Sequence, residues 1–217
     1  MSSPSSSSPK PCPEARPDDG IVGEEGHNRS SRSGLTWILD PLDGTTNFVH
    51  GLPPFGVSVA VWTGYDPTTQ SGTPVAAALY DVAHEEQWSA VAGLGATLDG
   101  QRLRARPVTA LREAVVGTGF SHYDSIRAAE IRLLAELLPR VGDLRRSGAG
   151  AFDLCSVAAG RLDAFYQAGL KVWDYAAARL TVTESGGDVT LLAGLGGSAP
   201  TVLAAAPGLS GELTPFL

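Results

Sequence analysis

Cysteine, long apolar runs and clustered positive charge are all scarce in this sequence. There are two cysteines in 217 residues, Cys12 and Cys155, which argues against a disulfide framework or a cysteine-based zinc site and is typical of a reducing compartment. No apolar stretch is long enough to span a bilayer, and the N-terminal segment lacks the apolar region of a secretory signal. We therefore expect a cytoplasmic protein that binds no membrane. The net charge of −7 without a Lys/Arg-rich block argues against a nucleic-acid partner.

The remaining composition predicts one globular domain with a polar tail. Hydrophobic residues make up 43% of the chain and charged residues 18%. Residues 1–17 contain six Ser and five Pro with few apolar side chains, so we predict that they are disordered. Residues 18–217 are predicted to form a single domain, with a strand-rich first half (about 18–110) and an α/β second half (about 111–217).

The first half is predicted to be an antiparallel sheet. Its apolar and alternating segments indicate strands at 20–25, 36–40, 55–62, 75–80 and 85–91. Asp99-Gly100 lies between two short apolar segments and predicts a hairpin. Residues 67–74 are rich in turn formers and are predicted to be a turn-rich insertion.

In the second half, helices and strands are predicted to alternate. Helical spacing of apolar residues predicts helices at 125–138, 151–159 and 174–185, each followed by a helix-stopping Pro or Gly. Strands are expected at 115–118, 144–147, 162–167 and, as the last strand, 189–192. The fold class that follows is a layered α+β protein.

Asp40 and Asp43 lie three residues apart, where an apolar strand runs into a Gly-Thr-Thr turn. Two carboxylates on a tight loop can bridge divalent cations, and the Leu42 carbonyl between them is a further oxygen ligand. If the turn opens a helix, its first N–H groups can receive a phosphate. Together these features suggest metal-assisted phosphate ester chemistry. The competing interpretation is an ordinary turn at Asp43-Gly44 with Asp40 as a cap.

Other acidic and basic residues permit both functional and structural interpretations. Adjacent carboxylates at Glu24-Glu25 are usually a solvated turn, and Asp174 before an Ala-rich helix is most simply its N-cap. Glu184 is interpreted as structural, and Arg145-Arg146 as a solvated pair that can alternatively contact phosphate. The four histidines have no metal-binding spacing and are interpreted as surface or loop residues: His27, His50, His84 and His122.

The joint pattern is more specific than any one part. In chain order the sequence contains Gly23-Glu24-Glu25, then Trp-Ile-Leu-Asp-Pro-Leu-Asp-Gly-Thr-Thr-Asn-Phe from Trp37, then Trp-Asp-Tyr-Ala-Ala-Ala from Trp173 with Thr-Glu-Ser-Gly-Gly ending at Gly187. From Gly20 to Leu192 this resembles the inositol monophosphatase family of lithium-sensitive, Mg²⁺-dependent sugar phosphatases.

The resemblance implies a fold, a cofactor and site residues. The fold would be an α-β-α-β-α layered sandwich, usually in a homodimer, and two or three Mg²⁺ ions would bind in each active site. Their ligands would be Glu24, Asp40, the Leu42 carbonyl, Asp43 and Asp174. Glu24 and Thr45 would position and help deprotonate the attacking water, with Asp43 also counted as catalytic. The backbone N–H groups of Gly44 and Thr45 would bind phosphate oxygens.

The substrate implied is a small phosphorylated polyol or sugar, with inositol monophosphate first. Its hydroxyls would meet Asp43, Asp174 and the segment from Ala149 to Ala151. Gln167 stands where many inositol-specific members have Glu, so histidinol phosphate, fructose-1,6-bisphosphate and nucleotide 3′-phosphates remain alternatives. Family members also begin with two long helices ahead of the Gly-Glu-Glu strand. Here a Ser/Pro segment leads into Asp18-Asp19, so we expect apolar surface on one face of the first sheet, and a shortened, catalytically weak binding module is a further alternative.

Overall fold

The computed structural model describes residues 15–26, 28–108, 110–121, 123–195 and 199–217, so most of the predicted tail and Cys12, His27 and His122 lie outside the described residues. The first half of the chain forms a seven-stranded sheet, here called sheet A, whose spatial order follows the sequence. Its strands are β1 (Gly20–Gly23), β2 (Leu35–Asp43), β3 (Gly56–Asp66), β4 (Ser71–Asp81), β5 (Glu86–Val91), β6 (Gly95–Leu98) and β7 (Gln101–Arg102).

The second half forms a five-stranded mixed sheet, sheet B, in the order β11-β12-β10-β8-β9. Its strands are β8 (Val115–Thr118), β9 (Asp143–Arg145), β10 (Ala164–Ala168), β11 (Asp188–Leu192) and β12 (Thr201–Ala205). The helices are α2 (Thr45–His50), α3 (Asp124–Leu137), α4 (Gly150–Ala158), α5 (Val172–Glu184) and α6 (Ser210–Leu213). Among the described residues, none of the helices is long and apolar enough to cross a membrane.

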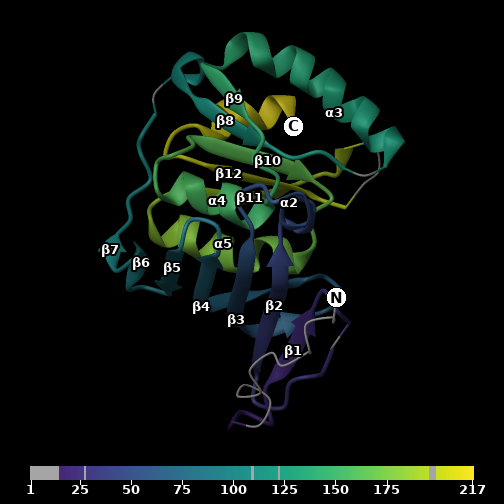
Figure 1. Ribbon diagram of the computed structural model, residues 1–217, viewed down its shortest axis with the longest axis vertical. Helices are drawn as coiled ribbons and strands as arrows, with labels where there is room; N and C mark the ends of the chain where they lie inside the picture. The colour runs from purple at the N-terminus through teal and green to yellow at the C-terminus, as the bar shows by residue number, and fades with distance from the viewer. Residues whose placement is uncertain (1–14, 27, 109, 122, 196–198) are drawn as a thin grey trace.

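The elements stack in layers, which confirms the predicted layered α+β class (Figure 1). Helices α4 and α5 lie between the two sheets and contribute to one core with the inner face of sheet A. Helices α3 and α6 lie near the other face of sheet B and form a second core there. The described layers are therefore sheet, helices, sheet and helices, in that order.

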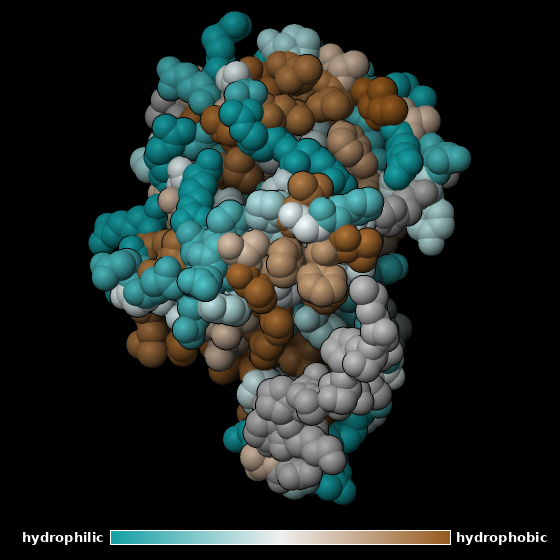
Figure 2. All heavy atoms as spheres, in the orientation of Figure 1, coloured by the Kyte–Doolittle hydropathy of each residue, from teal (hydrophilic) through white to brown (hydrophobic). Residues whose placement is uncertain are grey.

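Alternation along the strands of sheet A gives it one buried and one open face. In β3 and β4 the side chains of Ala60, Trp62 and Leu79 are buried, whereas Val57 and Tyr80 are exposed. Figure 2 shows hydrophobic residues gathered on the lower half of the molecule, over the strands of sheet A. The expectation that this sheet carries exposed apolar surface is confirmed for these described side chains.

The prediction that sheet A is antiparallel throughout is wrong at its first strand. β1 pairs in parallel with β2, with Gly20 opposite Thr36 and Gly23 opposite Leu39. A parallel pair needs a connection long enough to return the chain to the same end of the sheet, and residues 24–34 supply it. The remaining neighbouring pairs of sheet A are antiparallel, including the hairpin predicted at Asp99-Gly100.

The prediction that the strand at 189–192 is the last one in the chain is also wrong, because β12 follows it. All five residues of β12 are buried, and the strand lies between β10 and β11. A central strand buried on both faces lacks the alternation that marks a half-exposed strand, and two of its five residues, Ala204 and Ala205, are alanines with little strand preference.

Smaller differences concern where elements begin and end. Residues 71–74, predicted as part of an insertion, are the start of β4, so the insertion is a tight hairpin. Helix α5 begins at Val172, two residues before the predicted start at Asp174. Leu138, the last residue of the helix predicted at 125–138, lies beyond the end of α3 and is exposed.

Asp163 anchors sheet B, and its removal is expected to destabilise the protein. The carboxylate is 1% exposed, accepts two bonds from the Nη2 atom of Arg106 (both 2.7 Å) and accepts the Val115 N–H at 2.8 Å. Asp163→Ala leaves that N–H and the guanidinium without their partner. Because Arg106 is half exposed and can be rehydrated, we expect a loss of about 2–3 kcal/mol in the free energy of unfolding, measured by urea denaturation.

The ion pair between Asp18 and Arg32 provides the control, since both of its side chains are largely exposed. Asp18→Ala should cost less than about 1 kcal/mol. Equal effects of the two substitutions would show that Asp163 is no more than another surface charge.

Candidate active site

The end of β2 carries the first part of the site. Asp40 and Asp43 are both buried, and the pairing with β3 shifts register between them, which turns both carboxylates to the same region. The Asp40 Oδ1 atom accepts the Leu42 N–H at 2.9 Å, and the Thr45 hydroxyl donates to the Leu42 carbonyl at 3.0 Å. These short-range bonds fix the loop that the sequence pattern singled out.

Gly44 makes the turn from β2 into α2 possible. Its φ of 82° lies in the left-handed region, and a Cβ there would lie 2.8 Å from the Pro54 carbonyl oxygen and 3.0 Å from the Ala149 Cβ. Another residue would therefore displace either the 53–55 segment or the start of α4. The close approach brings α2 against the loop that precedes α4.

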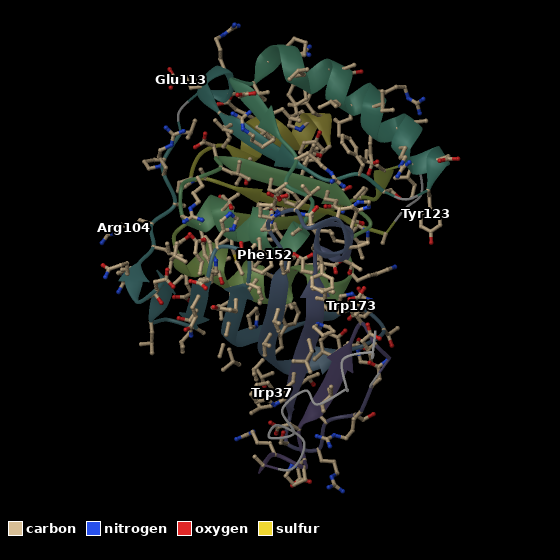
Figure 3. All side chains as sticks on the ribbon, in the orientation of Figure 1. Trp37, Arg104, Glu113, Tyr123, Phe152 and Trp173 are labelled. Carbon is tan, nitrogen blue, oxygen red and sulfur yellow. The ribbon has the colours of Figure 1, made fainter. Side chains whose placement is uncertain are left out.

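Two helix starts complete the carboxylate group. The Ala151 N–H, in the first turn of α4, donates to the Asp43 Oδ2 atom at 2.8 Å. Asp174 is the third residue of α5 rather than its N-cap, and its Oδ2 atom accepts the Lys171 N–H at 2.7 Å. Figure 3 labels Phe152 and Trp173, which follow Ala151 and precede Asp174 and so locate the two helix starts.

A cavity of about 180 Å³ opens at this junction. Five of the residues predicted for the site line it, and they come from α2, β10, α5 and the end of β2: Asp43, Gly44, Thr45, Gln167 and Asp174. Asp40 is buried and is not among the residues that line the cavity. Ala149 and Ala151, predicted to meet the substrate, are buried, and Gly150 between them is the residue that lines the cavity.

Glu24 lies beside the carboxylates from a different direction. It follows β1 and is exposed, and its N–H donates to the Leu39 carbonyl at 3.3 Å. Its charge acts on both Asp40 and Asp174 and raises their pKa values. The parallel pairing of β1 with β2 is what places Glu24 there.

Burial and mutual repulsion dominate the electrostatics of the group. Burial, with neighbouring carboxylates adding to it, raises the pKa of Asp40 to about 7 and that of Asp174 to about 6. The same causes raise the pKa of Asp43 well above its ordinary value. In the part of the chain that the structure describes, none of the ion pairs involves these three carboxylates. A bound cation would compensate their charge.

The donor chemistry fits a hard divalent cation. Asp40, Asp43 and Asp174 each use one oxygen to accept a backbone N–H, and carboxylate oxygens are the ligands that Mg²⁺ prefers. Among the described residues, no three Asp, Glu, His or Cys side chains lie in an arrangement that could hold a metal ion as they stand. Binding a cation therefore requires the remaining oxygens to turn toward it.

Several cavity residues were not predicted from the sequence. Gly119 and Phe120 come from the end of β8, and Asp153 from α4. Asp153 is an acid within an otherwise apolar helix, a signal that could have identified it, whereas Gly119 and Phe120 carry none. Burial raises the pKa of Asp153 to about 6, although hydrogen bonds from Ser147 and Gly148 and the positive charge of Arg146 act to lower it.

The structural interpretations of several other residues agree with the geometry. Glu184 accepts the N–H groups of Gly93 and Gly95, both at 2.8 Å, and so ties α5 to the β5–β6 turn. His84 is half exposed and bonds to Asp81, and His50 ends α2 on the surface. Cys155 is a buried free thiol whose pKa is raised by burial.

A larger cavity, of about 440 Å³, lies between β1, the 28–31 loop, Tyr65 and the start of α5. None of the described residues that line it carries a carboxylate, the group that would hold a cation or activate water. The smaller cavity is the candidate active site on its chemistry.

Comparison with known proteins identifies the family of this chain. The inositol monophosphatase family model matches residues 7–214. A relative from Mycobacterium tuberculosis named inositol-1-monophosphatase SuhB is 44% identical over 208 residues, covering 91% of this chain and 69% of the relative. A relative from Xylella fastidiosa named Nus factor SuhB is 40% identical over 176 residues, covering 81% of this chain and 61% of the relative.

A solved structure of Mycobacterium tuberculosis SuhB has the same fold. It superposes with a TM-score of 0.81 at 44% identity, covering 94% of this chain and 77% of that structure. The family match, the sequence identity and the shared fold show that this chain belongs to the inositol monophosphatase family.

Proposed function

We propose that this chain is a Mg²⁺-dependent phosphomonoesterase acting on a small polyol or sugar phosphate, with inositol monophosphate as the first candidate. The observation that carries the proposal is the group formed by Asp40, Asp43 and Asp174. These carboxylates repel one another, and two of them, Asp43 and Asp174, line the cavity that α2 opens onto. Family membership supports a phosphatase and a general dependence on metal.

The chain's own residues would hold two or three Mg²⁺ ions. Asp40, Asp43 and Asp174 would offer their remaining carboxylate oxygens, Glu24 its exposed carboxylate, and Leu42 its carbonyl. Bound Mg²⁺ would lower the pKa of a coordinated water and stabilise the phosphoryl and leaving oxygens. The N–H groups of Leu42, Ala151 and Lys171 keep the three aspartates oriented for this task.

Around the reacting atoms, Glu24 and Thr45 have distinct roles in the proposal. Glu24 is exposed and would accept the proton of the attacking water. The Thr45 hydroxyl, bonded to the Leu42 carbonyl, would position that water from the opposite side. The backbone N–H groups of Gly44 and Thr45 would receive phosphate oxygens, and no covalent phosphoenzyme is needed.

Substrate hydroxyls would meet Gln167, Gly150 and the carboxylates of Asp43 and Asp174. The segment from Ala149 to Ala151 would act mainly through its backbone, because both alanines are buried. Gln167 has a neutral amide that can hydrogen-bond to hydroxyls of differently shaped substrates. Histidinol phosphate, fructose-1,6-bisphosphate and nucleotide 3′-phosphates are therefore tested as alternative substrates. Because β2 of sheet A and β10 of sheet B both supply lining residues, residues 18–217 act as one catalytic domain in this proposal.

The test is phosphate release from inositol 1-phosphate during a Mg²⁺ titration of the purified chain. We expect no release in a chelating buffer and a saturable rise on adding Mg²⁺, because the carboxylates need a cation to bind an anionic substrate. The named alternative substrates are assayed in parallel and ranked by kcat/KM.

Circular dichroism and a cooperative unfolding curve show that the assayed protein is folded. Release that persists in the chelator would contradict the metal-dependent mechanism. A folded protein that releases no phosphate from any substrate would favour the alternative of a catalytically weak binding module.

A further inference from the structure

Gly119 and Gln167 lie against each other in the wall of the candidate active site. Gly119 directly follows β8, Gln167 belongs to β10, and both residues line the cavity. The two strands are parallel neighbours in sheet B (Figure 1), with Thr118 opposite Tyr166. Because the register continues, the next residue of each strand falls beside the other, and sheet B brings together two lining residues that are far apart in the sequence.

The Gln167 side chain occupies the space that a side chain at Gly119 would need. A Cβ at Gly119 would lie 1.9 Å from the Gln167 Oε1 atom, 2.3 Å from its Cδ atom and 3.0 Å from its Cγ atom. The three nearest atoms therefore all belong to one flexible side chain, and none of them to the backbone. The Gln167 amide lies across Gly119, a position that only a residue without a Cβ permits.

The backbone that follows Gly119 is held in place by α3. The Ser121 N–H donates to both carboxylate oxygens of Glu130, at 3.1 and 3.0 Å, and the Arg127 Nε atom donates to the Ser121 carbonyl at 2.6 Å. Glu130 is 2% exposed, so this attachment is buried. A side chain added at Gly119 would therefore displace the Gln167 amide rather than the backbone.

The Gln167 amide is available to a ligand. Within the described chain it makes no hydrogen bond to another residue, although a glutamine side chain carries two donors and an acceptor. Its Oε1 atom is also near Gly150, where a Cβ would lie 3.7 Å from it. The amide thus lies between two glycines in the cavity wall, where a substrate hydroxyl can reach it.

We propose that Gly119 is a positioning residue: its missing side chain lets the Gln167 amide lie along the cavity wall, and the enzyme thereby favours phosphate monoesters that carry a hydroxyl within reach of that amide. This inference rests on the proposed function, in which Gln167 meets a substrate hydroxyl while the phosphate lies at the metal-binding carboxylates. Gly119 acts on substrate affinity through Gln167 and takes no part in the chemical step.

The test compares inositol 1-phosphate with 4-nitrophenyl phosphate, a monoester without hydroxyl groups, as substrates of the wild type and of Gly119→Ala. The variant should raise KM for inositol 1-phosphate by about 3- to 12-fold, the usual effect of losing a neutral hydrogen bond, and leave kcat within about threefold. KM for 4-nitrophenyl phosphate should change by less than about twofold, because that substrate offers the amide no hydroxyl.

A double-mutant cycle shows whether Gly119 acts through Gln167. Gln167→Ala should raise KM for inositol 1-phosphate about as much as Gly119→Ala does, and the double variant should lose nothing further, because the added methyl group then enters emptied space. Gly211→Ala is the matched control: it adds the same methyl group in α6, where it meets no atom within 4 Å, and should leave both substrates unaffected. Additive losses in the double variant, or equal losses on the two substrates, would overturn the inference.

The fold of Gly119→Ala should be preserved. Gly119 is not among the residues with a positive φ, so alanine suits its backbone conformation, and the variant should unfold at nearly the temperature of the wild type. A crystal structure of the variant should show the Gln167 side chain turned away from residue 119 with β8 unmoved. An unmoved Gln167, or a displaced β8, would overturn the inference.

Binding of inositol 1-phosphate, measured by calorimetry in the presence of Mg²⁺, separates this inference from the proposed function. If no turnover is seen, binding that is weakened to the same extent in Gly119→Ala, Gln167→Ala and the double variant supports the role of Gly119 while the proposed phosphatase fails. Equal binding by the wild type and Gly119→Ala, including no detectable binding by either, overturns it.

Discussion

Replacing Asp43 with Asn is expected to abolish phosphate release while leaving the fold at least as stable as that of the wild type. In the proposed mechanism Asp43 is a ligand to the cation that stabilises the transition state, an effect worth several kcal/mol, so kcat/KM should fall by about 10³-fold or more. The variant keeps an oxygen that can accept the Ala151 N–H, now 2.8 Å from Oδ2. It also removes one charge from a buried group whose members repel one another.

The measurement pairs steady-state kinetics with thermal unfolding in chelator and in Mg²⁺. Without metal, the unfolding midpoint of Asp43→Asn should equal or exceed that of the wild type. With Mg²⁺ the wild type should gain more stability than the variant, because it binds the ion more tightly in the native state. Asp66→Asn is the control: it changes the same side chain at an exposed hairpin turn, and should alter neither quantity.

Two outcomes would count against this role of Asp43. Turnover within tenfold of the wild type would show that the carboxylate is dispensable. A large drop in the unfolding midpoint without metal would show that Asp43 mainly supports the packing of α4 against β2, and that lost activity follows from lost structure.

The site residues that lie close together in the sequence could be predicted from the sequence alone. Asp40, Leu42 and Asp43 follow a strand, and Thr45 opens a helix, so local rules place them within one turn. The sequence block around Trp173 identifies Asp174 as a site residue. It does not predict that Asp174 is the third residue of α5, because neither Lys171 nor Val172 is a typical cap that would mark where the helix starts.

Residues brought in from distant strands could not be predicted in the same way. Gly119 and Phe120 reach the cavity because β8 lies parallel to β10, which carries Gln167. Arg146 lines the cavity on a loop that Asn47 holds through the Ser147 carbonyl, a contact between residues 100 positions apart. Such partners depend on the order of strands in sheet B, and that order depends on β12, the strand missing from the prediction.

Replacing Gly56 with Ala is expected to lower the stability of the protein strongly, and far more than replacing Gly211 with Ala. Gly56 is the first residue of β3, opposite Asp43 in β2 and Asp81 in β4. A Cβ there would lie 1.9 Å from the Tyr80 carbonyl oxygen and 2.8 Å from the Phe152 Cζ atom. The nearer atom belongs to the backbone, so no side-chain rotation relieves the clash and β3 must separate from β4.

We expect Gly56→Ala to lower the free energy of unfolding by about 3 kcal/mol or more, at the upper end of overpacking substitutions. For a chain of this length that corresponds to a fall of about 6–12 °C in the unfolding midpoint. Phosphate release should fall as well, because the displaced strand pairs with Asp43. Nothing in the Phe55-Gly56-Val57 sequence reveals this, since the obstructing oxygen comes from the neighbouring strand.

Gly211→Ala is the matched control, because a Cβ at Gly211 in α6 meets no atom within 4 Å. That variant should be neutral or more stable by up to about 1 kcal/mol, since alanine restricts the unfolded chain and favours the helix. If Gly56→Ala unfolded at the same midpoint as Gly211→Ala, β3 and β4 would have to be free to move apart at this end. The position of Asp43 would then be set by the Ala151 N–H and the Asp40–Leu42 turn rather than by its pairing with β3.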